Sequence, residues 1–233
     1  MVLVYLVAKI RMAYHPAGFL PPTEGIVLLE PLLRFDFKDP SDLQKWHEHS
    51  FTGKTQYEII ENGGEKFLKG ASHGTSSVLF IEAPADIRKR PFLTWEWRVG
   101  KFPTGKKNRV FGAKRDNDYG ARIYVVFKGK LPFQNNVIQY IWDDHFPVHE
   151  HRDSPFLRNV KMLVVRHGPP PSGEKWVSEK RDLVRDYQML FKKRPRDLMV
   201  LGIATDSDDT GTGSEAAFKT LAVEIPKNSP AGG

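Results

Sequence analysis

Residues 92–99 read FLTWEWRV. Apolar side chains stand at every second position of this stretch, at Leu93, Trp95, Trp97 and Val99, and polar side chains stand between them. Because successive side chains of a β-strand point to opposite faces, the alternation predicts a strand with one face in an apolar core. We therefore expect Trp95 and Trp97 to be buried.

Short runs that alternate apolar and polar residues continue from about residue 33. Gly, Pro or Asp separates them every eight to twelve residues, a spacing typical of sandwiches and barrels. The further predicted strands are 56–61, 66–69, 76–82, 121–128, 137–142, 160–166, 198–205 and 217–225. Between 178 and 194, apolar residues at helical spacing predict one helix that ends before Pro195. The pattern predicts an all-β, antiparallel β-sandwich with one short helix.

Length and composition favour a single domain, because all-β domains of about 200 to 250 residues are common and this chain has 233. We expect a loosely ordered N-terminal extension over 1–30, one sandwich domain over 31–227 and a tail over 228–233. The chain has no cysteine, which excludes disulfides and thiol chemistry. The first apolar run, Met1 to Ala8, is too short to span a membrane, and its charges follow it, unlike those of a signal peptide.

Several runs together resemble one bacterial family, domain of unknown function 3047. They are LTWEWRV at 93–99, DNDYGARIYVVF at 116–127, IQYIW at 138–142, Asp186-Tyr187 with Phe191, and DSDDTG at 206–211. The resemblance covers residues 33–226 and implies a jelly-roll-like sandwich akin to carbohydrate-associated domains, in a periplasmic or secreted protein, without an activity. Lys192 and the run Phe218-Lys219-Thr220 depart from the pattern expected of this family.

Two strands offer candidate ligand-binding residues. Arg122 and Tyr124 alternate with apolar neighbours, so we expect both on an open face of the sheet, and Glu96 and Arg98 share a face of another strand. Together they would line a polar, aromatic concavity that suits a glycan. The alternative is a structural ion pair of Glu96 with an arginine. Two further candidates, which suit either the site or the core, are Tyr140 and Trp142.

Two acidic or histidine-rich segments are candidate metal sites. Asp206, Asp208 and Asp209 offer the oxygen ligands of a structural calcium ion, although the loop also fits an ordinary aspartate-rich turn. The segment 143–151 carries His145, His149 and His151 beside acidic residues, and it fits either a metal site or an exposed polar loop.

Positive charge is concentrated in one window. Residues 88–115 hold ten basic residues and one acid, a net charge of +9, whereas the whole chain carries +7; the basic residues are Arg88, Lys89, Arg90, Arg98, Lys101, Lys106, Lys107, Arg109, Lys114 and Arg115. Such a stripe would attract polyanions, acidic polysaccharides included, or would only solubilise the protein. Nucleic acid is the less favoured partner, because the loops lack interleaved aromatic residues.

These observations leave three functions open. The first is a non-catalytic carbohydrate-binding or cell-envelope module, with an acidic polysaccharide as one candidate partner. The second is a polysaccharide lyase or glycoside hydrolase, in which Arg122 would neutralise a substrate carboxylate and Tyr124 or His145 would move a proton. The third is a structural domain that contacts another protein. No phosphate-binding loop, nucleophile elbow or dinucleotide fingerprint is present.

Overall fold

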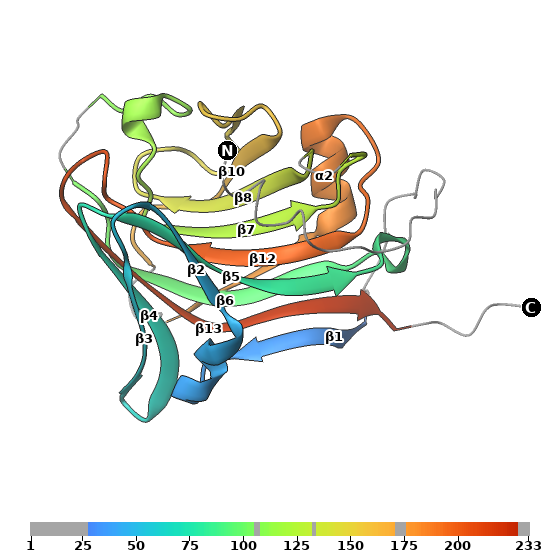
Figure 1. The fold of residues 1–233 in the computed structure, drawn as a ribbon, viewed down its shortest axis with the longest axis horizontal. Coiled ribbons are helices and arrows are strands. Elements are labelled where there is room, and N and C mark those ends of the chain that lie inside the picture. Colours follow the sequence, from blue (N-terminus) through green and yellow to red (C-terminus); the bar gives the residue numbers. More distant parts are fainter. Residues whose placement is uncertain (1–27, 105–107, 132–133, 171–175, 228–233) are drawn as a thin grey trace, which may run out of the picture.

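Two β-sheets pack face to face in the computed structural model, which describes residues 28–104, 108–131, 134–170 and 176–227 (Figure 1). The six-stranded sheet contains β1 (Leu29–Asp36), β3 (Gln56–Asn62), β4 (Glu65–His73), β6 (Phe92–Lys101), β11 (Val177–Asp182) and β13 (Gly213–Pro226). Its order is β11-β6-β13-β4-β3, and β1 also pairs with β13.

The seven-stranded sheet has the order β2-β5-β12-β7-β8-β10-β9. Its strands are β2 (His47–Thr52), β5 (Ser76–Ala85), β7 (Ala121–Phe127), β8 (Asn136–Asp143), β9 (His151–Asp153), β10 (Val160–His167) and β12 (Leu198–Ala204). Short 3₁₀ turns η2 (Pro40–Lys45), η3 (Ile87–Lys89) and η4 (Lys114–Asp116) lie between strands, and α2 (Leu183–Phe191) lies at one end of this sheet (Figure 1).

The predicted all-β sandwich with one short helix is confirmed, with differences in detail. One pair of strands, β8 and β10, is parallel. Residues 178–182, which we assigned to the helix, form most of edge strand β11, and α2 begins only where the Asp182 carboxylate accepts the N–H groups of Val184 and Arg185. Lys192 ends α2 with a φ of 55°, a conformation that glycine adopts more easily.

The predicted termini lie largely outside the described residues. Of the expected extension, residues 29 and 30 belong to β1, and 1–27 fall outside the part that the structure describes, as does the tail 228–233. No helix within the described ranges is long and apolar enough to cross a membrane.

Four aromatic rings join the two sheets across the core. Trp95 and Trp97 of β6 are buried, as expected. Trp95 stacks on Tyr140 of β8 with 5.4 Å between ring centroids, and Trp97 lies 5.3 Å from Trp142 of the same strand. Tyr140 and Trp142 are therefore core residues, and their rings face away from the outer surface of the sheet.

Strand β7 is buried on both faces. Ile123, Val125 and Phe127 face the core between the sheets, and Tyr124 and Val126 belong to a second apolar cluster on the outer face. The expectation that Arg122 and Tyr124 lie on an open face is wrong, because Arg122 is only 2% exposed and Tyr124 only 5%. The reason is a cover of loops from distant parts of the chain, which alternation within one strand does not register.

Candidate functional site

A pocket of about 430 Å³ lies over the outer face of the seven-stranded sheet. This volume falls in the range of about 300 to 1,000 Å³ that is usual for small-molecule sites. Its polar lining consists of Thr52, Ser76, Asn117, Arg122, Gln139, Ser154, Asp206, Asp208 and Asp209. Its apolar and aromatic lining consists of Phe51, Tyr124, Phe156, Leu157 and Val160.

Neighbouring strands place three polar side chains together in this pocket. Arg122 and Tyr124 are two residues apart on β7, so both point outward, and Gln139 of β8 lies directly across from Tyr124. Gln139 is 7% exposed, and its Oε1 atom has no hydrogen-bond partner among the described residues. The same holds for Nε of Arg122. Because buried polar groups are nearly always paired, two such atoms among the residues that line one pocket are unusual.

The rest of the Arg122 guanidinium is held by the protein itself. It forms an ion pair with the Asp206 carboxylate, donates to the backbone carbonyl of Asn117, and lies 4.4 Å from the ring centroid of Tyr119. Its Nη1 is 3.5 Å from the Tyr124 hydroxyl. Burial and these contacts fix the orientation of Arg122 and use most of its donors.

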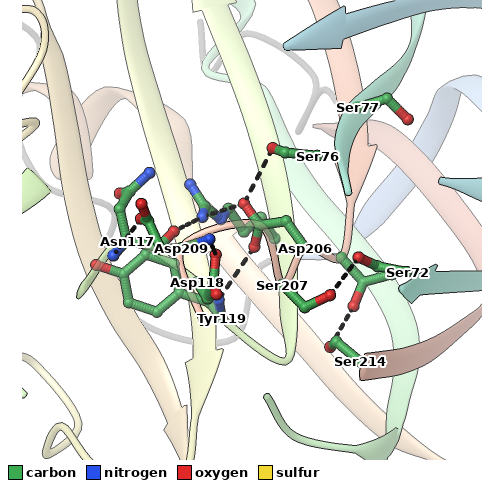
Figure 2. A network of polar contacts seen from close by, with 12 residues as sticks. Ser72, Ser76, Ser77, Asn117, Asp118, Tyr119, Asp206, Ser207, Asp209 and Ser214 are labelled. Carbon is green, nitrogen blue, oxygen red and sulfur yellow. Dashed lines mark hydrogen bonds and ion pairs between the residues drawn. The ribbon is translucent and has the colours of Figure 1, made fainter. Parts of the chain in front are cut away.

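Asp206 is the buried partner of Arg122. Its carboxylate also accepts hydrogen bonds from the Tyr119 N–H at 3.0 Å and the Ser76 hydroxyl at 3.4 Å (Figure 2). Burial raises the pKa of Asp206 to about 7, although Arg122 lowers it, and the nearby Asp118 adds to the rise. The carboxyl group can therefore hold or release a proton near neutral pH.

Two loops are tied together beside this pair. The Asp118 carboxylate accepts the N–H groups of Asp209 at 3.1 Å and Thr210 at 2.7 Å. The Asp209 carboxylate accepts the Asn117 N–H at 3.0 Å (Figure 2). The reciprocal bonds fix the loop after β12 against the loop before β7. The loop after β12, residues 206–211, is the acidic loop, and these bonds hold it in place at the edge of the pocket.

Three carboxylates come close enough to share a cation. Single oxygens of Asp118, Asp206 and Asp208 lie within 4.8 Å of one another, the one such group found in the described residues. Of the predicted calcium ligands, Asp206 and Asp208 belong to it, whereas Asp209 instead bonds the Asn117 backbone. Asp118 already accepts two N–H groups, and Asp206 is paired with Arg122. Calcium binding stays a prediction.

The calcium prediction can be tested by thermal melting in chelator and in millimolar calcium. If the ion binds, the melting temperature will rise with calcium, by an amount that corresponds to about 2.7 kcal/mol at a hundredfold excess over Kd. The rise should disappear in Asp208→Asn. Equal melting temperatures of the parent in the two buffers would exclude a structural calcium ion.

The other predicted ligand-binding residues lie elsewhere. Glu96 and Arg98 are on the outer face of β6, in the six-stranded sheet, on the side of the molecule opposite the pocket. Arg98 lies against the rings of both Phe67 and Trp176, 4.5 Å and 4.8 Å from their centroids. The structure therefore does not bring Glu96 and Arg98 together with Arg122 and Tyr124.

The predicted basic stripe is divided among separate contacts. Arg88, Arg90 and Arg109 form ion pairs with Asp86, Asp182 and Asp143, and the Arg109 side chain is buried. Lys106 and Lys107 lie outside the described residues. The three histidines of the other candidate metal segment are exposed and take no part in the carboxylate group; they are His145, His149 and His151.

Several residues of the pocket were not predicted from the sequence. Gln139 and Asp118 stand inside runs that carry the family resemblance, and that position is a usable signal for both. Phe51 and Phe156 are exposed aromatic residues at the pocket. No pattern in the sequence marks either of them, since Phe51 lies in β2 and Phe156 follows β9, two strands that the sequence did not predict.

Comparison with known proteins gives a family and a set of distant folds. No curated protein matches the chain. Among solved structures, it is similar to a family 11 carbohydrate-binding module from a Clostridium thermocellum cellulosomal cellulase, at 8% identity and a TM-score of 0.44 over 89% of this chain and 100% of that one. A Bacillus subtilis protein of unknown function with a galectin-like fold has 10% sequence identity to this chain and a TM-score of 0.42, over 86% of this chain and 100% of that one.

A xylan-binding module gives 10% identity and a TM-score of 0.38 over 87% of this chain and 99% of that one. Likeness at this level assigns no function. The family comparison is more specific, since one family profile, described as protein of unknown function (DUF3047), matches residues 44–222. The match spans most of the sandwich, and the chain belongs to this family.

Proposed function

We propose that the pocket on the seven-stranded sheet binds a carbohydrate and that the protein acts as a binding module. The observation that carries the proposal is a pair of buried atoms that have no partner among the described residues, Oε1 of Gln139 and Nε of Arg122, on two residues that line the pocket. The first atom needs a donor and the second needs an acceptor. Sugar hydroxyls supply both, because each has one donor and two acceptor sites.

The apolar part of the lining supports the same ligand class. Phe51 and Phe156 are both about half exposed, and both contribute to the pocket. Aromatic rings at a pocket offer flat apolar surfaces, and the faces of pyranose rings are apolar as well. A sugar would therefore contact rings at the walls and buried polar atoms at the floor.

One observation favours a catalytic alternative. Asp206 and Asp208 line the same pocket, and a carboxyl group with a pKa of about 7 beside a second carboxylate is the kind of pair that glycoside hydrolases use. A lyase has less support, because Arg122 is already paired with Asp206 and is not free to neutralise a substrate carboxylate.

The test is an unbiased glycan array, followed by calorimetric titration of the glycans that bind. Phe156→Ala is expected to weaken binding about tenfold through loss of ring contact, and Gln139→Ala about fivefold to tenfold through loss of one hydrogen bond. Met189→Ala is the matched control, because Met189 is also exposed but lies on α2, outside the pocket. Product analysis of the bound glycan separates binding from cleavage.

Two outcomes would count against the proposal. If no glycan binds, carbohydrate binding is excluded as the function of this pocket. If a glycan binds and both pocket variants retain the affinity of the parent, the carbohydrate site lies elsewhere. Release of shorter products would instead identify a hydrolase or lyase that uses the same pocket.

A further inference from the structure

The charges that line the pocket are unbalanced. They comprise one guanidinium, Arg122, and three carboxylates, Asp206, Asp208 and Asp209. Arg122 forms its ion pair with Asp206, so its charge is already compensated inside the protein. The positive group that the sequence offered to an acidic glycan is therefore not available to one.

Asp208 is the carboxylate left open to a ligand. It is half-buried and lines the pocket, and no donor within the described ranges bonds to its side chain. Asp209 differs, since its carboxylate accepts the Asn117 N–H. A carboxylate that loses water without gaining a donor is unfavourable, so a ligand that fills this pocket has to supply a donor at Asp208.

We propose that Asp208 makes the pocket selective for saccharides that carry an amino group and against saccharides that carry a carboxylate. This inference rests on the proposed function and names the class of its ligand. An ammonium group provides a charged donor to Asp208, and charge-assisted hydrogen bonds are about twice as strong as neutral ones. A uronic acid would bring a second negative charge to a partly desolvated carboxylate, where like charges repel strongly.

Three oligosaccharides with one β-1,4-linked glucose backbone test the selectivity. One is the glucosamine oligomer, one the unsubstituted glucose oligomer, and one the oligomer oxidised to the carboxylate at C6. Titrations are made at low salt and in chelator, so that neither screening nor a bound divalent cation contributes. The parent protein is expected to bind the glucosamine oligomer about tenfold more tightly than the glucose oligomer, and the oxidised oligomer least.

The variants assign this preference to one side chain. Asp208→Asn should bind the glucosamine and glucose oligomers with about equal affinity. Asp208→Glu, which keeps the charge, should still bind the glucosamine oligomer more tightly. Glu58→Gln is the control for net charge, since Glu58 is exposed on β3 of the other sheet. Thermal melting of each variant, compared with the parent, shows that the fold is intact.

Failure of this inference differs from failure of the proposed function. If the array and the titrations show binding of glycans with the carboxylated ones preferred, the selectivity is wrong and carbohydrate binding stands. The selectivity is equally wrong if Asp208→Asn keeps the full amine preference. If no glycan of any charge class binds, the proposed function itself fails and the selectivity fails with it.

Discussion

Replacement of Trp97 by alanine is expected to lower the free energy of unfolding by about 3 to 5 kcal/mol, the usual cost of truncating a large buried aromatic residue. Trp97 is fully buried, and its ring contacts Trp95 on its own strand and Trp142 on the opposite sheet. The substitution therefore leaves a cavity where the two sheets meet. Urea unfolding of variant and parent measures the difference.

Trp176→Ala is the matched control for this experiment. Trp176 is a tryptophan outside the core, and it packs on Phe67 and Arg98 at the outer face of the six-stranded sheet. Its removal should cost clearly less than the removal of Trp97, because its surroundings can relax into solvent. Equal costs for the two variants, or a Trp97→Ala midpoint that coincides with the parent, would contradict the central place of Trp97 in the core.

Replacement of Arg122 by methionine is expected to cost about 3 to 5 kcal/mol of stability, because it leaves the buried Asp206 without its cation. Methionine retains apolar bulk, so the main loss is electrostatic. In the double variant with Asp206→Asn, the stranded charge is gone, and part of the stability should return. A single variant that melts like the parent would show that Arg122 contributes little to the fold.

The pH dependence distinguishes a stranded charge from lost packing. The folded-state pKa of Asp206 is about 7, above its ordinary value of 3.8, so between these values the folded chain keeps a proton that the unfolded chain has released. The stability contribution of this group therefore falls as pH rises through that window and is level above it. Without Arg122 the pKa moves higher, and the fall continues above pH 7.

The free energy of unfolding that Arg122→Met loses relative to the parent should thus be larger at about pH 8.5 than at about pH 6. The difference should reach up to about 1.4 kcal/mol for each pH unit by which the variant raises the pKa of Asp206. The double variant has no carboxyl group at position 206 and should lack this slope. A deficit that is constant with pH would mean that packing, and not charge, accounts for the loss.

The alternation in 92–99 predicted its strand well because one face of β6 is in the core and the other in contact with solvent. The same reasoning failed at Arg122, because β7 is covered on its outer face by residues such as Leu157 and by the acidic loop. It also left Tyr140 and Trp142 undecided, since every residue of β8 is buried and the pattern then distinguishes no face. Burial by loops is a long-range property that local periodicity does not contain.

The candidate site was only partly predictable for a similar reason. Arg122, Tyr124, Asp206 and Asp208 carry recognisable chemistry, and all four line the pocket. Gln139 is of interest because its Oε1 atom has no hydrogen-bond partner among the described residues. A missing partner cannot be predicted from a sequence pattern. Strand β11 was missed because it is an edge strand with few apolar residues at alternate positions. The helical spacing of the apolar residues that follow it was therefore extended back over the strand.

Strand β13 has a consequence for the order in which the molecule can assemble. Its 14 residues pair with β6 along one edge and with β4 and β1 along the other, so they form the middle of the six-stranded sheet. During translation, every strand that pairs with β13 leaves the ribosome before it does. Until β13 is made, the edges of these strands that will pair with it carry unpaired backbone N–H and C=O groups, which can pair with other chains. The sheet can close only after synthesis of β13, so these edges stay unpaired until nearly the whole sandwich has been made.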